Sequence, residues 1–541
     1  MPLHPGNQHE SVSAVGAIKA AAGAQRLAHG LKEEFDTIVI GSGMGGMTTA
    51  AVLSRFGHKV LLLEQAQEIG GLTHSFSRAG FTWDVGLHYC GLFGHDQEPG
   101  RLLDWLSDGA IEFHSLGTVY DTLHFPDGFE IPVARPAEAY KAELRERFPE
   151  NAAEIDAYFD ALRSATNAAR AVSIERSMPK PIRSIHRLWK NRQIEEWCGR
   201  TTGDVIAEFI SDPKLAAILS AQWGTFGGRP DKASFGIHAM IMSHYLDGAG
   251  YPVGGGATIS KGLVPVIEAA GGVAQAGTPV SEIVIQGGRA VGVRTAAGEE
   301  FRAPVIVSAI GAGETVKRLL PTECSQQNWA GEIANFEPAV CHFEVFLGFE
   351  GDIAKYGATR SNHWFYESWD TNNGIWSSVD SPIPMMFVNF PSLKDPAHDP
   401  GPRQRHTGEF MTLASWSAVK KFAGGGAKEH AAEWAASKKK VKTKMMAFFE
   451  ARFPALAPLV AYHELGTPLA TAAFTAHEKG GFYGVEGTPR RMLTDSLSAR
   501  TPVPGLFLSG QDILTPGIAG AFMAGILCAA AVDSRVFQKL M

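Results

Sequence analysis

The sequence has few cysteines and no excess of positive charge. Its 541 residues include five cysteines, an odd number, and no two of them are spaced as Cys-x-x-Cys. This argues against a disulfide framework and a structural zinc site, so we expect free thiols and a reducing, cytoplasmic location. The 49 basic and 56 acidic side chains give a net charge of −7. A diffuse excess of acid is the wrong sign for a nucleic-acid surface, and we expect no nucleic-acid partner.

Long uncharged runs give little support for a membrane span. The run 513–532 has twenty residues without a charged side chain, which is enough to cross a bilayer. However, Pro516 and Gly517 interrupt it near its start, and glycine and alanine dominate the rest. We therefore predict a buried helix that begins near Gly517. Residues 1–33 are rich in alanine and are predicted to form an N-terminal extension, with an organellar transit peptide as the alternative.

The strongest local pattern is a strand, a glycine-rich turn, a helix and a second strand in residues 35–65. Gly41, Gly43 and Gly46 form Gly-x-Gly-x-x-Gly, in which the glycines allow a tight turn, a close approach to a pyrophosphate and close helix–strand packing. Glu64 ends the second strand, where a carboxylate can accept hydrogen bonds from a ribose diol. Together these features predict a dinucleotide-binding βαβ unit of an α/β protein.

A second complete fingerprint is missing. Gly311 and Gly313 follow a predicted strand, but position 316 is Val316 instead of glycine. A built-in domain for NAD(P)H is therefore not expected. Electrons must come from an external donor, or pass to an external acceptor such as oxygen, a quinone or the substrate itself.

Apolar runs predict further strands at 280–285, 290–295, 305–309, 342–347, 386–390 and 409–414. The region 111–250 is largely helical in pattern. Several short motifs accompany them. These are GSGMGG at 41–46, GGLTHSF at 70–76, GFTWDVGLHYCG at 80–91, PSLKDP at 391–396, GTPLAT at 466–471, GGFYG at 480–484 and GQDILTPGIAGAFMAG at 510–525.

With these motifs the chain, from about Phe35 to its end, resembles FAD-dependent oxidoreductases of the phytoene desaturase type. The narrower motifs resemble the retinol saturase and carotenoid isomerase branch. The resemblance implies a discontinuous Rossmann-like FAD-binding domain, with an inserted mixed α+β substrate-binding domain. We assign 34–105, 251–325 and 495–541 to the first domain, and 106–250 and 326–494 to the second.

The resemblance also implies which residues hold the FAD. The glycine loop and Glu64 would bind the ADP half, Gly71 would lie near the flavin half and Val280 near the adenine. Asp512 would approach the ribityl chain or the pyrophosphate, and the helix after Gly517 would begin at the isoalloxazine. The predicted cofactor-binding residues are Gly41, Gly43, Met44, Gly46, Glu64, Gln65, Gly71, Leu72, Val280, Gly510, Asp512, Gly517, Ile518 and Ala519.

His88 and Tyr89 are the candidates for catalysis, because they lie in one of the narrow motifs. The alternative is a structural histidine and a core aromatic. By resemblance, the substrate is a hydrophobic polyene (a retinoid, carotenoid or polyunsaturated fatty acid), and its C=C bonds are saturated, isomerised or desaturated. Two alternatives stay open, namely a flavin amine oxidase and a non-enzymatic prenyl-lipid carrier on the same fold.

Two surfaces are predicted to meet apolar partners. Aromatic side chains that would line a substrate site are Trp364, Phe365, Tyr366, Trp369, Trp376, Phe387 and Phe390. The stretch 180–192 alternates basic and apolar residues, which suits peripheral contact with an anionic membrane surface. A solvated helix face is the other interpretation.

Overall fold

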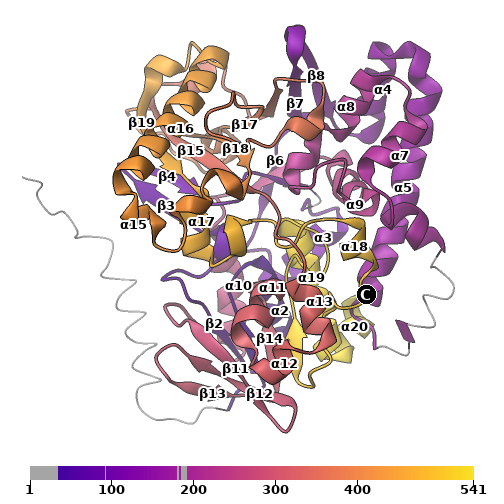
Figure 1. Cartoon of the computed structure of the whole chain (residues 1–541), viewed down its shortest axis with the longest axis vertical. Helices are drawn as coiled ribbons and strands as arrows, with labels where there is room; N and C mark the ends of the chain where they lie inside the picture. Colours follow the sequence, from indigo (N-terminus) through magenta and orange to yellow (C-terminus); the bar gives the residue numbers. More distant parts are fainter. Residues whose placement is uncertain (1–33, 92, 180–181, 184–191, 541) are drawn as a thin grey trace, which may run out of the picture.

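Five short strands lie parallel in one sheet, in the half of the molecule at the bottom of Figure 1. This computed structural model describes residues 34–91, 93–179, 182–183 and 192–540, so the predicted extension 1–33 lies outside it. The order is β10-β2-β1-β14-β20. The strands are β1 (Thr37–Ile40), β2 (Val60–Leu63), β10 (Val273–Gln275), β14 (Val305–Ser308) and β20 (Leu506–Leu508). They come from all three segments predicted to form the FAD-binding domain.

Helices cover this sheet and bring distant parts of the chain together. The main ones are α2 (Met44–Arg55), α10 (Thr258–Ala269) and α19 (Ile518–Val532). α19 packs on α2 so closely that a Cβ on Gly525 would lie 2.6 Å from the Cβ of Thr48. The uncharged run near the end of the chain is thus an internal helix that begins just after Gly517, as predicted. Within the described ranges, no helix combines the length and apolar character that crossing a membrane requires.

A small antiparallel sheet adjoins this half, in the order β11-β12-β13. Its strands are β11 (Val280–Gln286), β12 (Arg289–Thr295) and β13 (Glu300–Arg302). The first two were predicted from their apolar runs. β13 was not, because it is three residues long and both of its ends are charged and exposed.

The other half contains a seven-stranded sheet, in the order β19-β15-β18-β17-β16-β7-β8. The strands are β7 (Val119–Phe125), β8 (Phe129–Ala134), β15 (Cys341–Glu350), β16 (Asn362–Tyr366), β17 (Met385–Asn389), β18 (Arg405–Ala414) and β19 (Val460–Gly466). β15 and β18 pair over ten residues and form its centre. The β7–β8 hairpin corrects the sequence analysis, which expected a largely helical pattern in that region.

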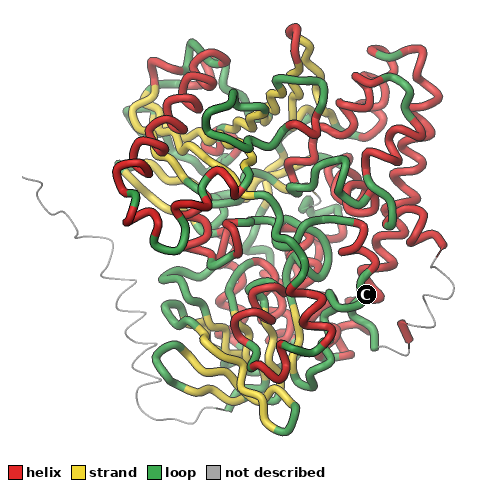
Figure 2. Tube along the Cα trace, viewed as in Figure 1, coloured by secondary structure: helices red, strands yellow, loops and turns green. Residues whose placement is uncertain are grey.

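Helices flank this sheet on two sides, as Figure 2 shows. One group consists of α4 (Ala137–Arg147), α5 (Ala152–Glu175), α7 (Thr202–Phe209), α8 (Pro213–Ser220) and α9 (Phe235–Leu246). On the other side, α16 (Ala431–Arg452) buries Val441, Met445 and Phe449, one per turn, in a core that also contains Phe349 and Phe410 of the sheet. Because side chains alternate along a strand, β15 and β18 keep a second face that is free to line a site.

Candidate active site

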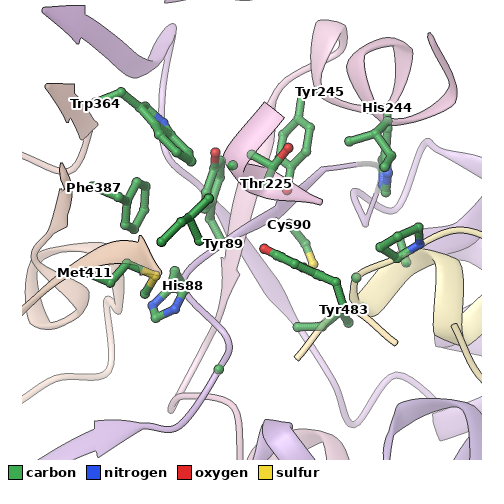
Figure 3. Close-up of a pocket in the computed structure, with 18 of the residues that line it drawn as sticks. His88, Tyr89, Cys90, Thr225, His244, Tyr245, Trp364, Phe387, Met411 and Tyr483 are labelled. Carbon is green, nitrogen blue, oxygen red and sulfur yellow. The ribbon is translucent and has the colours of Figure 1, made fainter. Parts of the chain in front are cut away.

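One pocket lies where the start of α19 meets the uncovered face of the seven-stranded sheet. Figure 3 shows the rings of Trp364 and Phe387 on one side of it, with Tyr245 and Tyr483 across from them. The described lining residues are Gly86, His88, Tyr89, Cys90, Gly224, Thr225, Ile241, His244, Tyr245, Trp364, Met385, Phe387, Met411, Leu413, Tyr483, Pro516, Gly517, Ile518 and Ala519. The pocket thus joins the predicted catalytic pair to the three residues predicted to face the isoalloxazine.

The glycine loop after β1 leaves open space in front of a helix. A Cβ on Gly43 would meet no atom within 4 Å, and no side chain caps α2 there. By contrast, a Cβ on Gly46 would lie 2.0 Å from the carbonyl oxygen of Gly41, and Gly41 itself has φ +94°. The first amides of α2 therefore face an unfilled cradle, which fits a pyrophosphate.

Three further predicted residues gather around this cradle. A Cβ on Gly71 would come within 2.7 Å of the Gly43 Cα, and one on Gly45 within 2.5 Å of the Gly510 Cα. Met44 is buried at the first position of α2. These backbones are packed too tightly for side chains, so the loop can hold a cofactor only through main-chain groups.

Leu72 links the cradle to the pocket. A Cβ on Gly86, which lines the pocket, would lie 3.2 Å from the Leu72 Cβ. At the other end, Gly517 has φ +89° and open space around it, and α19 begins at the next residue. A fifteen-residue helix with its amino terminus at the pocket favours negative charge there, as on a reduced flavin ring.

Glu64 has contacts that the sequence did not predict. Its Oε2 accepts hydrogen bonds from the Ser42 amide (2.8 Å) and hydroxyl (2.6 Å), and its Oε1 accepts one from the Ala66 amide (2.9 Å). The carboxylate therefore fastens the glycine loop to the end of β2. A carboxylate has about four lone-pair sites, so contact with a ribose remains open to it and stays a prediction.

Asp512 also holds the chain together. Its Oδ2 accepts a hydrogen bond from the Ala312 amide (2.7 Å), and its Oδ1 accepts one from the Val485 amide (2.9 Å). It is 3% exposed. Asp512 thus joins the loop after β14 to the segment before the last strand, and its predicted contact with the ribityl chain or pyrophosphate stays a prediction.

The predicted adenine end lies away from the pocket. Val280 is the first residue of β11, and the Thr278 amide just before it donates to the Glu64 carbonyl at 2.7 Å. Gln65 is exposed, and its Nε2 donates to the Phe474 carbonyl at 3.4 Å. Both residues therefore lie beside the end of β2, and neither reaches the catalytic pair.

The structure places His88 and Tyr89 side by side but gives them different partners. The Nδ1 of His88 lies 2.8 Å from the Oε2 of Glu409, and the His88 side chain is 16% exposed toward the pocket. The Tyr89 hydroxyl donates to Asp121 at 3.0 Å. Burial, together with the charge of Asp121, raises the pKa of the Tyr89 hydroxyl well above its ordinary value. Tyr89 therefore forms part of the pocket wall, and the catalytic role of His88 stays a prediction.

A buried polar network behind this pair was missed by the sequence analysis. Lys394 of the PSLKDP motif is 0% exposed and donates to the carbonyl of His88 (2.8 Å), Asn362 Oδ1 (2.6 Å) and Asn389 Oδ1 (2.8 Å). Burial lowers the pKa of Lys394 to about 7. Asp121 accepts from Tyr89 and from the amides of Gln222 (2.6 Å) and Asn362 (2.8 Å), and burial raises its pKa to about 6. These bonds fix the backbone and side chains around His88.

Glu409 and Glu344 were missed as well, although a signal was present. Each is the single acid in a mainly apolar predicted strand, 342–347 for Glu344 and 409–414 for Glu409. Strand alternation puts both on the face opposite α16, and a buried charge there needs a partner.

The aromatic residues predicted to line a substrate site lie on both faces of the seven-stranded sheet, because side chains alternate along each strand. Trp364 and Phe387 line the pocket, whereas Phe365, Trp376 and Phe390 pack in the core under α16.

Most of the predicted membrane-contact stretch, 180–192, lies outside the described residues. Within it, Ile182 is 54% exposed. Arg183 is buried, and its guanidinium donates to the Ser498 hydroxyl at 2.6 Å. This arginine therefore binds the protein itself, which corrects its assignment to a membrane-facing surface.

Comparison with known proteins agrees with this geometry. A family model described as flavin containing amine oxidoreductase matches residues 44–533. The all-trans-retinol 13,14-reductase of Danio rerio is 28% identical over 536 residues, which cover 94% of this chain and 88% of that protein. The chloroplastic prolycopene isomerase of Daucus carota is 26% identical over 529 residues, which cover 94% of this chain and 82% of that protein.

Among solved structures, cyclohexylamine oxidase from Brevibacterium oxydans IH-35A superposes with a TM-score of 0.58 at 17% identity, covering 93% of this chain and 100% of that one. This likeness shows the fold. The predicted fold, the FAD cofactor and the resemblance to the retinol saturase and carotenoid isomerase branch are thereby confirmed, and the carrier alternative is set aside. The chain belongs to the flavin containing amine oxidoreductase family and is an FAD-dependent oxidoreductase.

Proposed function

We propose that the protein saturates C=C bonds of a hydrophobic polyene, a retinoid, carotenoid or polyunsaturated fatty acid. The observation that carries this proposal is the aromatic and apolar pocket that joins His88 to the start of α19. Two relatives are named for a retinol reduction and a prolycopene isomerisation, and both of those substrates are polyenes. Desaturation and isomerisation use the same constellation, and the experiment below separates them from saturation.

The charge of the pocket argues against an amine as the substrate. None of the described lining residues is Asp, Glu, Lys or Arg. His244 is neutral near pH 7 because burial lowers its pKa to about 4. An alkylammonium ion would lose its hydration there without gaining a carboxylate partner, which is costly. An uncharged chain of conjugated bonds has no such cost.

The residues of the chain divide the work as follows. When bound, FAD supplies or accepts the hydride. The rings of Trp364, Phe387 and Tyr245 hold the polyene and exclude water. His88 supplies a proton at the pocket surface, because Glu409 binds its Nδ1 and leaves Nε2 for the substrate. Lys394 keeps the His88 backbone in place through its carbonyl.

Electrons and substrate both come from outside the chain in this proposal. The single complete dinucleotide fingerprint favours an external electron donor or acceptor. We also keep a cytoplasmic location with peripheral contact at a membrane as a proposal. It is supported by the expected apolar substrate and by the exposed Ile182.

The test begins with the purified holoenzyme, reduced anaerobically and mixed with retinoids, carotenoids or polyunsaturated fatty acids. A product heavier by two hydrogens, with flavin oxidised in step, supports saturation. A product of unchanged mass with altered double-bond geometry would make the protein an isomerase. If no polyene is consumed and an alkylamine instead reduces the oxidised flavin, the proposal is wrong.

A further inference from the structure

Two glutamates stand directly behind His88. One ring nitrogen of His88 and one carboxyl oxygen each of Glu344 and Glu409 all lie within 4.8 Å of one another. In the β15–β18 register Glu344 is opposite Met411 and Glu409 is opposite Phe346, so the two acids are diagonal neighbours on one face of the sheet. They sit on the pocket side, because Met411 lines the pocket.

Both carboxyl groups are buried, and each has one oxygen without a hydrogen-bond partner among the described residues. Glu344 is 2% exposed and Glu409 is 0% exposed, and the Oε1 atom of each has no hydrogen-bond partner among the described residues. Two carboxylates this close in a dry environment repel each other, so one of them is held protonated. Protonation of one carboxyl group removes this repulsion.

The surroundings decide which acid keeps the proton. The Oε2 of Glu409 lies 2.8 Å from the Nδ1 of His88 and accepts a hydrogen bond from the Asn389 amide at 3.3 Å, so this carboxyl group has two nitrogen partners. The Oε2 of Glu344 lies 3.5 Å from the Nε2 of His342, and burial lowers the pKa of that histidine to about 4. Burial in turn raises the pKa of Glu344 well above its ordinary value.

Other charged groups around the pair are already engaged. The Lys394 ammonium is held by three oxygen atoms, one of them on Asn389. On β4 (Phe81–Asp84), Asp84 accepts from Ser75 and Tyr251, and burial raises its pKa. On β19, Glu464 accepts from the Tyr462 hydroxyl at 2.6 Å.

We propose that Glu344 is the protonated member of a carboxyl pair, leaving Glu409 as the single negative charge that orients His88 through its Nδ1. This rests on the function proposed above. In saturation one carbon of the double bond accepts a hydride with its electron pair, and the other accepts the proton from His88 Nε2. His88 becomes neutral and regains a proton from solvent. His88 is the catalytic residue, and the two glutamates are positioning residues that act through it.

The first measurement needs no substrate. An infrared difference spectrum between the wild-type holoenzyme and Glu344→Gln, near neutral pH, should show the carbonyl band of a protonated carboxyl in the wild type. That band should shift in D₂O. Glu350→Gln is the matched control, because Glu350 is on the same strand but contacts the surface Arg403 and Arg405. It should keep the band, and Glu344→Asp should keep a displaced one.

Kinetics then separate the two acids. Because glutamine is uncharged like a protonated glutamate, Glu344→Gln should leave the pH profile of turnover unchanged, whatever it does to the rate itself. Glu409→Gln should lose turnover by about 10²–10⁴-fold with full flavin content, since His88 loses its counter-ion. In D₂O the wild-type product should carry a deuterium from solvent at the carbon that receives the proton.

Three results would overturn the carboxyl pair. The first is a carbonyl band that persists in Glu344→Gln. The second is a pH profile of Glu344→Gln whose basic limb lies at lower pH than that of the wild type. The third is a divalent cation that the wild type binds stoichiometrically and Glu344→Gln does not bind. Failure of the proposed function looks different. The infrared band would then be present as expected, while no polyene is consumed by any variant.

Discussion

In the five-stranded sheet the cofactor cradle is made of backbone, whereas in the seven-stranded sheet the pocket wall is made of side chains. The cradle requires Gly46 and Gly71 because main-chain groups approach them too closely for a Cβ, and it requires Gly43 because a side chain there would enter the open space in front of α2. The wall requires Glu344 and Glu409 on one face of two paired strands. A site built from backbone is encoded by a run of neighbouring residues, which can be recognised as a motif. A site built from side chains is encoded by single residues that lie far apart in the sequence.

The two faces of the seven-stranded sheet repeat this contrast on a smaller scale. Toward α16 the sheet packs a dry aromatic core with Phe349, Phe410 and Phe449. Toward the pocket it presents Phe387 and Met411 beside buried acids. The first face provides stability and the second tolerates buried charge, so substitutions on the two faces should change different observables.

The largest effect is expected at the cradle. Gly43→Val should fold and lose its FAD, because the valine side chain would fill the empty space that the pyrophosphate needs. Flavin absorbance per purified chain measures this. Gly331→Val is the control, since Gly331 also has open space around its Cβ and an ordinary φ. A Gly43→Val protein with full flavin content would show that the cradle is not the cofactor site.

Glu64→Ala should likewise abolish FAD retention, because Glu64 anchors the glycine loop through Ser42. Its loss frees Ser42 and with it the glycine loop. Glu64→Gln separates this role from ribose binding, because an amide oxygen can still accept from Ser42. Flavin content that recovers in the glutamine variant would indicate that loop anchoring dominates.

At the pocket, His88→Ala should keep bound FAD and lower turnover by about 10²–10⁴-fold, the usual contribution of a general acid. The pH dependence of turnover should change with it, since the group that donates the proton is gone. His244 serves as the comparison, because it also lines the pocket but bonds the Gly91 carbonyl at 2.9 Å. Normal turnover in His88→Ala would remove the assignment.

The sequence analysis succeeded where neighbouring residues determine structure. The glycine motif, β1, β2 and the start of α19 follow from local pattern alone. The β7–β8 hairpin was missed because it lies in a stretch, 111–250, whose other described elements are mostly helices. Lys394, Asp121 and Glu409 were missed because each has a partner tens or hundreds of residues away in the sequence.

A smaller effect, confined to stability, is expected on the other face of the sheet. Phe449→Ala should lower the free energy of unfolding by about 3–5 kcal/mol, because it empties a fully buried site between α16 and the sheet. Flavin content and turnover of the folded variant should stay as in the wild type. Phe387→Ala on the pocket face should instead change the KM for the polyene. Equal kinetic effects from both variants would contradict the division between the two faces.

The smallest effect concerns Lys394 and pH. Its pKa is about 7 in the folded protein and near 10.5 when unfolded, so between pH 7 and 10 the unfolded chain binds more protons at this site. The free energy of unfolding should therefore rise with pH there, by at most about 1.4 kcal/mol per pH unit from this group. Lys394→Met should remove that slope, whereas Lys439→Met, at an exposed position of α16, should retain it. Urea unfolding at several pH values measures the difference, and equal slopes would mean that burial does not lower the pKa of Lys394.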